Sequence, residues 1–471
     1  MTDRITPQTL RLALAFATAG AAVLATSGAV AAHAFTQPSS FKYAVSVGAP
    51  LLVFGLCVAR QPLRAAVALV VVAAPFADLS AGVGPVQVPL LGALLLLACA
   101  AAVVTTRPPR ALGPVGVAAV AGAVLLAPAV AHGARPASAT LVVAAMVVTG
   151  WLVSVVAATP DGRRWVLGAL LASMSLQAAL AIYMFRTGNR LHLYGTAGQP
   201  TFSGDYFFTL EGTKRPTGAF SDPISLGNAL GLALPLALAG AAGAFQRAAA
   251  RLLAAGAGLL IAVALTLTLS RMSWIGAAAG LLVCLGALPA GRRAPSVIVM
   301  GVLVAVTLAA GSRIVGPELV QRAESALRPT ASDSQSAESD RERVLLWKAA
   351  LTTAEDHPIA GVGVNRINAQ LQRRATGVHE ATHAHSTYLQ ILAEAGLLGA
   401  LALLSLIATL ATAAIRGLRV DRMVAAGAAG GLVAVFVAWS TDYTIRYVPV
   451  AITMAVLFGL VAALGHREAT G

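Results

Sequence analysis

Histidines that could bind a metal or act as a base are concentrated in one stretch of the sequence. Four of the chain's eight histidines are His357, His379, His383 and His385. Residues 379–383 read His-Glu-Ala-Thr-His, the form of the zinc-hydrolase HExxH motif. That motif needs a helix, so that both imidazoles share one face. Gly377 closely precedes it, and a third ligand at His385 would point to another face. Solvated loop histidines are the competing interpretation of His379 and His383.

His385 differs because a long apolar segment begins directly after it. Ser386 or Thr387 could cap a helix that starts here, which would place the imidazole at the outer mouth of a membrane span. An imidazole accepts protons near neutral pH, so His385 is a candidate general base. The positive end of the helix dipole would favour the neutral ring. Glu394, deeper in the segment, predicts either a function or an ion pair to another span.

Arg215, Arg271 and Arg343 lie in loops that the charge pattern below assigns to the same side as His385. Their planar guanidinium groups stay charged and can bind phosphate oxygens bidentately. Such a set could hold a diphosphate at the membrane surface. Pairing with lipid head groups or carboxylates is the ordinary alternative for each arginine.

These residues must be positioned by membrane helices. Of the 471 residues, 58% are hydrophobic and only 11% are charged, whereas a soluble domain has about 25% charged residues. Apolar runs extend over almost the whole chain, which predicts one all-α membrane domain over residues 1–471. The net charge of +14 is distributed in short clusters between these runs. That distribution argues against a nucleic-acid partner and indicates a lipid bilayer.

The apolar runs predict about fourteen transmembrane helices, with about twelve as the lower estimate. The expected spans are 11–33, 43–59, 65–80, 86–105, 111–131, 138–159, 165–186, 223–244, 252–270, 272–289, 295–312, 386–414, 423–443 and 447–465. An alternative concerns the first of them. Arg4 and Arg11, an apolar stretch and then residues 32–34 could be a cleaved signal peptide, although the stretch is longer than usual for one.

The arginine pattern orients the chain through the positive-inside rule. When loops alternate from a cytoplasmic N-terminus, sixteen basic residues fall inside, and the short outer loops contain only Lys42, Arg135, Arg271 and Arg446. Both termini are therefore expected in the cytoplasm. Two long loops, 187–222 and 313–385, are expected outside. Within the second, 341–355 has helical apolar spacing, and 361–363 predicts a turn.

Several segments together resemble one family. Residues 385–399 read His-Ser-Thr-Tyr-Leu-Gln-Ile-Leu-Ala-Glu-Ala-Gly-Leu-Leu-Gly. This resembles the hallmark segment of the O-antigen ligase and polymerase superfamily, membrane glycosyltransferases that act on polyprenyl-diphosphate-linked sugars. Further resemblance lies in 215–223 (Arg-Pro-Thr-Gly-Ala-Phe-Ser-Asp-Pro), Ser270-Arg271, 341–347 and 357–363. The chain departs from the family pattern at Ser386 and Ile224, where asparagine is usual.

The resemblance implies a GT-C-like helical bundle in the bacterial cytoplasmic membrane, with its active site on the extracytoplasmic face. It also implies transfer of a glycan from an undecaprenyl-diphosphate carrier, with inversion at the anomeric carbon and without a metal or other cofactor. His385 would be the base. The diphosphate would be held by Arg215, Arg271, Arg341 and Arg343, and Ser386, Tyr388 and Glu394 would support the site.

The acceptor separates two versions of this activity. A ligase would transfer the glycan to lipid A core or another surface acceptor, whereas a polymerase would transfer it to the next carrier-linked repeat. The long second loop with its histidines favours the ligase. A transporter or lipid flippase is a remoter alternative, and it should show inverted repeats and broken helices in matching halves. This chain instead concentrates its polar groups in one half and on one side.

Overall fold

The computed structural model describes residues 61–77, 80–83, 86–105, 113–134, 136–188, 208–210, 213–315, 334–378 and 381–465. The predicted spans 11–33 and 43–59 and the alternative signal peptide lie outside these residues. So do His379 and Glu380 of the HExxH segment.

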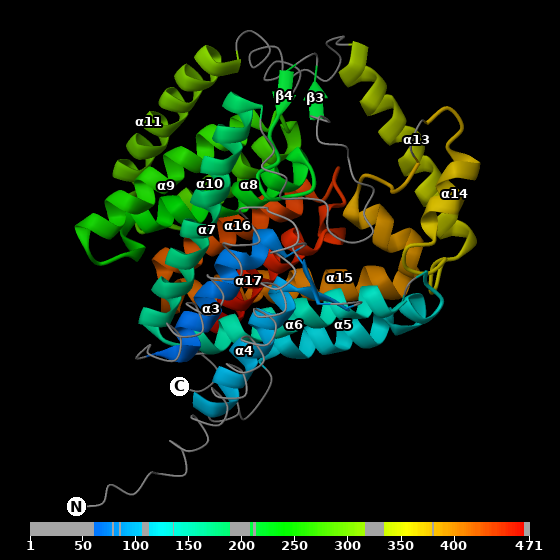
Figure 1. Ribbon diagram of the computed structural model, residues 1–471, viewed down its shortest axis with the longest axis horizontal. Helices are drawn as coiled ribbons and strands as arrows, with labels where there is room; N and C mark the ends of the chain where they lie inside the picture. Colours follow the sequence, from blue (N-terminus) through cyan, green and yellow to red (C-terminus); the bar gives the residue numbers. More distant parts are fainter. Residues whose placement is uncertain are drawn as a thin grey trace, which may run out of the picture.

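Helices make up most of the described chain (Figure 1). The α-helices are α3 (Pro62–Ala73), α4 (Leu90–Thr105), α5 (Pro114–Ala131), α6 (Pro136–Ala157), α7 (Pro160–Thr187), α8 (Pro223–Ala239), α9 (Ala248–Leu267), α10 (Arg271–Ala287), α11 (Ala290–Val315), α13 (Ser334–Asp356), α14 (Ile367–Arg374), α15 (Thr387–Val420), α16 (Arg422–Ala438) and α17 (Val448–Gly465). Shorter helical turns are η1 (Ala74–Phe76), η2 (Gly240–Ala244) and η3 (Thr444–Arg446).

Every predicted span from 65–80 onward coincides with a described helix. Within the described part of the chain, eight helices are long and apolar enough to cross a membrane, and three further apolar helices are shorter. The protein is thus an all-α polytopic membrane protein. The expected helix in the second loop is α13, which starts several residues earlier than predicted, at Ser334.

Two short hairpins depart from the purely helical prediction. Strand β1 (Ser80–Val83) pairs antiparallel with β2 (Val86–Pro89), so residues 86–89 are extended where a span was expected to begin. The alternation of Val86, Gln87 and Val88 before Pro89 suits a strand better than a helix start. Strands β3 (Phe208–Leu210) and β4 (Thr213–Arg215) form a second hairpin in the first long loop.

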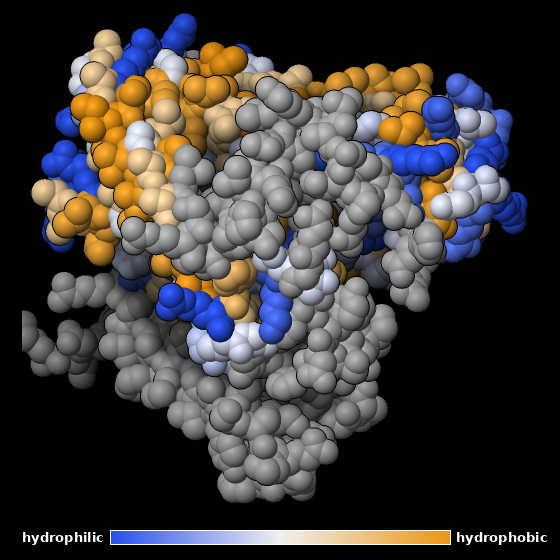
Figure 2. All heavy atoms as spheres, turned by 90° about the horizontal axis from the view of Figure 1, so that it is seen from above, coloured by the Kyte–Doolittle hydropathy of each residue, from blue (hydrophilic) through white to orange (hydrophobic). Residues whose placement is uncertain are grey.

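Small residues lie where the helices of the bundle contact one another. They allow the close contact between backbones that is a main source of helix association in membranes. A Cβ added at Gly280 of α10 would lie 2.4 Å from the Gly430 carbonyl of α16. One added at Gly459 of α17 would lie 2.4 Å from the Gly150 carbonyl of α6. The described surface is hydrophobic over α9–α11 and becomes hydrophilic over α13 and α14 (Figure 2).

The two sets of basic residues lie at opposite helix ends. Arg163, assigned to the inside, pairs with Asp421 (Nε–Oδ2, 3.0 Å) between α15 and α16. Arg422 donates to the carbonyl of Ala287, the last residue of α10 (2.9 Å). Arg271, assigned to the outside, is the first residue of that same helix. Arg271 and the Arg422 side chain therefore lie at opposite ends of α10.

Helix α15 is interrupted at Gly396. The segment that follows α13 forms hydrogen bonds with the backbone groups that this interruption leaves free. In a continuous helix, the N–H groups of Leu397 and Leu398 would donate to the carbonyls of Ala393 and Glu394. Instead, they donate to the carbonyls of Pro358 and Ile359 (2.8 and 3.2 Å). The freed carbonyls of Ala393 and Glu394 accept from Val362 and Gly363 (3.0 and 2.9 Å). All four groups at the break are therefore satisfied by residues 358–363.

Glycine is required on both sides of this contact. Gly396 has φ 60°, and a Cβ there would lie 2.4 Å from the Ile359 carbonyl oxygen. Gly361 has φ 66°, and a Cβ there would lie 2.2 Å from the Glu394 carbonyl carbon. The close approach of the two backbones thus depends on these two glycines.

We expect Gly361→Ala to destabilise the protein strongly. The left-handed backbone costs an alanine about 1–2 kcal/mol, and the collision with Glu394 adds about 1–3 kcal/mol. Gly377→Ala is the matched control, because Gly377 has φ 88° but a Cβ there meets nothing within 4 Å. Thermal unfolding in detergent should show a clearly larger loss for Gly361→Ala. Equal losses would mean that the loop does not press against α15 as described.

Candidate active site

His385 occupies a constrained turn at the start of α15. Its φ is 47°, a left-handed conformation that residues other than glycine seldom adopt. The following Ser386 caps the helix, its hydroxyl accepting from Leu389 N–H (3.4 Å). Thr387 N–H donates to the carbonyls of Trp439 and Asp442 (2.9 and 3.0 Å), which ties the turn to the α16–α17 connection. Such strain at a histidine is typical of functional sites.

His383 and Arg446 lie beside His385. The His383 and His385 rings have centroids 4.0 Å apart. Arg446 Nη1 lies 3.1 Å from His383 Nδ1, so the arginine donates to this nitrogen when it is unprotonated. The Thr382 hydroxyl lies 2.8 Å from the same nitrogen. Arg446 of the α16–α17 connection thus borders the histidine pair.

Both imidazoles are held neutral. Burial is the main cause that lowers the pKa of His385, to about 3, and the charges of Arg343 and Arg446 lower it further. Burial also lowers the pKa of His383, and His385, Arg446 and Arg343 add to the effect. The sequence suggested the helix dipole as the source of a neutral ring. In the structure, burial and the two arginines lower the pKa, and they keep the ring of His385 unprotonated.

Three of the four predicted diphosphate arginines are partly buried near this turn. Arg271 Nη2 donates to both carboxylate oxygens of Asp340 (2.7 and 2.9 Å), and Arg343 Nη1 lies 3.8 Å from one of them. Arg215 Nε donates to the Thr268 carbonyl (2.6 Å), three residues before Arg271. The fourth, Arg341, is exposed on α13.

A buried carboxylate, Asp442, lies beneath the arginines. Asn228 Nδ2 donates to it (3.4 Å), and Asn228 Oδ1 accepts from Ser273 (2.7 Å). Ser273 in turn shares a hydrogen bond with Ser270 (2.8 Å). Burial raises the pKa of Asp442 to about 6, although the charges of Arg343 and Arg215 and the Asn228 hydrogen bond oppose the rise and Asp222 adds to it. These hydrogen bonds connect the Ser270-Arg271 motif to the α16–α17 connection.

Of the predicted supporting residues, Ser386 caps α15, and Glu394 and Tyr388 make contacts away from the histidines. Glu394 accepts from Gln390 Nε2 (2.8 Å) and from Asn365 N–H (2.9 Å). Gln390 also accepts from Ala384 N–H (2.8 Å). Glu394 therefore fixes the turn that presents His385, and among the described residues it forms no ion pair. Tyr388 donates to the Phe436 carbonyl of α16 (2.7 Å).

Four residues of this cluster are not identified as site residues by the sequence. The sequence predicts a solvated or zinc-binding role for His383 and only an outer position for Arg446. Asp340 carried no motif. Asp442 was placed inside the span 423–443, whereas α16 already ends at Ala438. Ionisable Asp442 at the end of a predicted span was a usable signal, since such residues are costly within a bilayer.

The described half of the HExxH segment does not have the geometry that the zinc motif needs. Residues 381–383 form bends and irregular backbone instead of a helix. His383 faces His385 and Arg446, and a cation beside the imidazole disfavours a second cation there. His379 and Glu380 lie outside the described residues.

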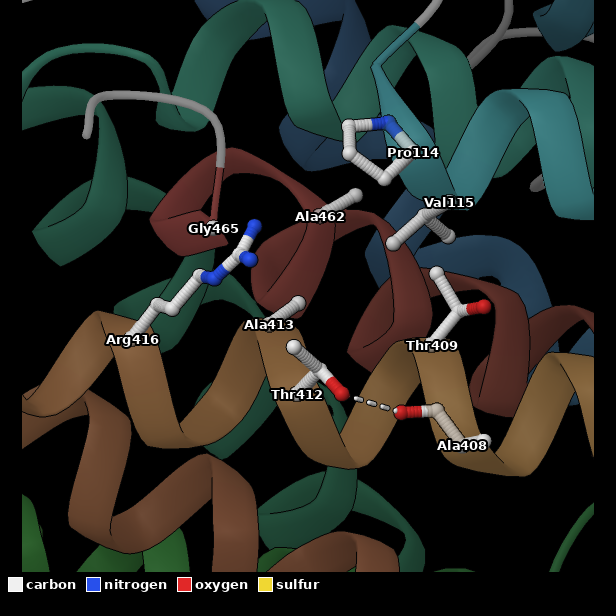
Figure 3. Close-up of a pocket in the computed structure, with 9 residues that line it drawn as sticks. All are labelled: Pro114, Val115, Ala408, Thr409, Thr412, Ala413, Arg416, Ala462 and Gly465. Carbon is white, nitrogen blue, oxygen red and sulfur yellow. Dashed lines mark hydrogen bonds between the residues drawn. The ribbon is translucent and has the colours of Figure 1, made fainter. Parts of the chain in front are cut away.

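A separate cavity of about 390 Å³ lies at the opposite end of α15 (Figure 3). Pro114 of α5, Arg416 of α15 and Gly465 of α17 border it, and most of its lining is aliphatic. Its threonine hydroxyls turn back to their own helix, as in the bond from Thr412 to the Ala408 carbonyl (2.7 Å). The cavity is therefore distinct from the histidine and arginine cluster.

Comparison with known proteins agrees with this cluster. Residues 256–404 match the family model described as O-antigen ligase, and this segment contains Arg271, Arg343 and His385. No curated protein matches the chain. This match supports the resemblance to the O-antigen ligase and polymerase superfamily that the sequence motifs indicate.

Asp442→Asn should stabilise the protein at neutral pH. The raised pKa means that ionising this carboxylate opposes folding, so the cost is present above pH ~6 and disappears below the unfolded value of ~3.9. A shift of this size corresponds to roughly 2–3 kcal/mol at most. We therefore expect a higher Tm than wild type at pH 7.5 and a smaller difference at pH 5.

Asp421→Asn provides the control for that experiment. Asp421 is paired with the buried Arg163 (3.0 Å), so its loss leaves a buried cation without its carboxylate and should lower the Tm. If Asp442→Asn also lowers the Tm at pH 7.5, the ionised carboxylate is a net stabilising partner of the arginines, and the described burial effect is wrong.

Proposed function

We propose that the protein is an O-antigen ligase-type glycosyltransferase. It transfers a glycan from an undecaprenyl-diphosphate carrier to an acceptor hydroxyl at the outer face of the bacterial cytoplasmic membrane. The observation that carries the proposal is the position of His385 at the start of α15, where its ring lies 4.0 Å from that of His383, which Arg446 contacts. Burial and the charges of Arg343 and Arg446 lower the pKa of His385 there. A base and a diphosphate-binding surface are thereby available at one place.

In this reaction, the His385 imidazole accepts the proton of the acceptor hydroxyl. The acceptor oxygen forms a bond to the anomeric carbon while the bond from that carbon to the diphosphate oxygen breaks. The carrier leaves as undecaprenyl diphosphate, and a single displacement inverts the configuration. Because the diphosphate is already a good leaving group, the reaction does not need a nucleotide or metal.

The arginines would stabilise the charge that develops on the leaving diphosphate. Arg271 and Arg343 share a carboxylate, which positions two cations close together. Arg215 is fixed through Thr268, immediately before the Ser270-Arg271 motif. Cations held in a partly buried site stabilise developing negative charge more effectively than mobile ones. Arg341 is exposed and would contribute to capture of the donor from the surface.

The positive-inside pattern supports the proposed orientation, with both termini in the cytoplasm and the loops 187–222 and 313–385 outside. Undecaprenyl-diphosphate-linked glycan, lipid A core and the bilayer are the corresponding partners. The acceptor decides between ligase and polymerase. Purified protein in vesicles should be given carrier-linked glycan together with either lipid A core or a second carrier-linked repeat. Transfer to lipid A core supports the ligase, elongation of the repeat supports the polymerase, and no transfer to either would refute the proposal.

His385→Ala and His385→Asn should each reduce transfer by roughly 10²–10⁴-fold. Asparagine tolerates the left-handed backbone, so this variant separates loss of the base from loss of the turn. His383→Ala should lose less, because His383 positions its neighbour. Chelators should have no effect, whereas a zinc hydrolase would need His383 and would be inactivated by chelation.

The pH dependence gives a second test of the base. Since the pKa of His385 is lowered to about 3, kcat/KM should not fall between pH 7 and 5 through protonation of this ring. An acid limb near pH 6 that disappears in Asp442→Asn would originate from Asp442 instead. Full activity of His385→Asn would exclude this residue as the base.

Replacing Arg215 or Arg271 by lysine should reduce transfer nearly as much as replacement by alanine. An ammonium cannot form the planar fork that binds two phosphate oxygens. Loss of one charge-assisted contact corresponds to about 10- to 150-fold. Initial rates over a range of carrier-linked donor concentrations would measure this. Lysine variants with normal kcat/KM would show that these arginines act only as surface charge.

A further inference from the structure

Asp340 of α13 is placed where an anion bound to two of the proposed donor arginines would lie. Its carboxylate accepts two hydrogen bonds from Arg271 Nη2 (2.7 and 2.9 Å). The same carboxylate lies 3.8 Å from Arg343 Nη1. Arg271 begins α10 and Arg343 lies on α13, so a single carboxylate bridges two elements that are far apart in sequence.

This carboxylate leaves part of the binding capacity of the two arginines unused. A distance of 3.8 Å is too long for a hydrogen bond, so Arg343 receives only charge neutralisation from Asp340. Among the described residues, the buried Nε of Arg343 has no hydrogen-bond partner. A buried donor without an acceptor is unfavourable. A ligand with more acceptor oxygens than one carboxylate would satisfy this site better.

We propose that Asp340 is an internal substitute for the donor diphosphate and is displaced from Arg271 and Arg343 when the donor binds. This inference rests on the proposed function. In the substrate-free protein, Asp340 offsets the repulsion between the two guanidinium groups and keeps them together. The diphosphate then replaces one carboxylate with several phosphate oxygens, and Asp340 turns towards solvent.

The exposure of the Asp340, Arg271 and Arg343 side chains supports displacement of Asp340 by a ligand and argues against a permanent ion pair. The Asp340 side chain is 35% exposed, whereas those of Arg271 and Arg343 are 11% and 19% exposed. The carboxylate is therefore the member that water reaches most easily and that can leave. Partly exposed ion pairs are weak, so a more highly charged anion can replace one. Return of Asp340 to the arginines would also assist release of the carrier diphosphate after transfer.

Inorganic pyrophosphate tests the exchange without requiring transfer. Its affinity for the purified full-length protein would be measured by calorimetry at fixed ionic strength. Asp340→Asn should bind pyrophosphate roughly three- to tenfold more tightly than wild type, because the competing anion is gone. Asp356→Asn is the matched control. It removes a carboxylate paired with Arg374 at the other end of α13, about 24 Å away along the helix.

The outcomes separate this inference from the proposed function. Tighter binding by Asp340→Asn with unchanged binding by Asp356→Asn supports exchange. Equal or weaker binding by a folded Asp340→Asn means that the carboxylate positions the arginines without competing, and overturns the inference. Absence of binding by wild type, with no difference from Arg271→Ala, refutes the diphosphate site itself. Asp340→Ser would replace Asp340→Asn if the asparagine variant unfolds.

Discussion

The break in α15 is the constraint on which the arrangement around the histidines and arginines depends. In a bilayer, a broken helix needs partners for its freed backbone groups, since no water is present to supply them. Residues 358–363 provide these partners as a short segment of turns that packs against Gly396. Because that segment directly follows α13, its docking also fixes where α13 ends. Helices α13 and α14 consequently lie beside the outer end of α15 (Figure 1).

Helix α15 contains the interruption at Gly396 and begins directly after the turn that holds His385. Glu394 lies two residues before Gly396, and it joins Asn365, which follows the segment 358–363, to Gln390, which holds the backbone of Ala384. A disturbance at the break would therefore reach His385 through three hydrogen bonds within one short stretch. Glu394 need not touch a substrate to matter for function, because it holds together the segment that carries Arg343 and the turn that carries His385.

This packing brings charged side chains together at the N-terminal end of α15. Arginines from β4, α10, α13 and η3 approach the same region, and Asp340 and Asp442 offset part of their charge. Partial burial strengthens every one of these interactions relative to bulk water. The excess of cations suits a diphosphate, and burial together with the same cations lowers the pKa of both histidines. One arrangement thus favours the binding of an anion and keeps the imidazole of His385 unprotonated.

The sequence by itself determined the apolar helices, the alternation of basic residues and the position of His385 at a helix start. These features are local, since they depend on the length of an apolar run, the neighbouring charges and a capping residue. Tertiary structure alone decided the break at Gly396, the bridge from Asp340 to Arg271 and the contact of Arg446 with His383. The members of the last two pairs are separated by 69 and 63 residues, and no local pattern links them. A helix with its own apolar periodicity carries no sign of being interrupted, because the interruption is stabilised only when a distant segment supplies the missing hydrogen bonds.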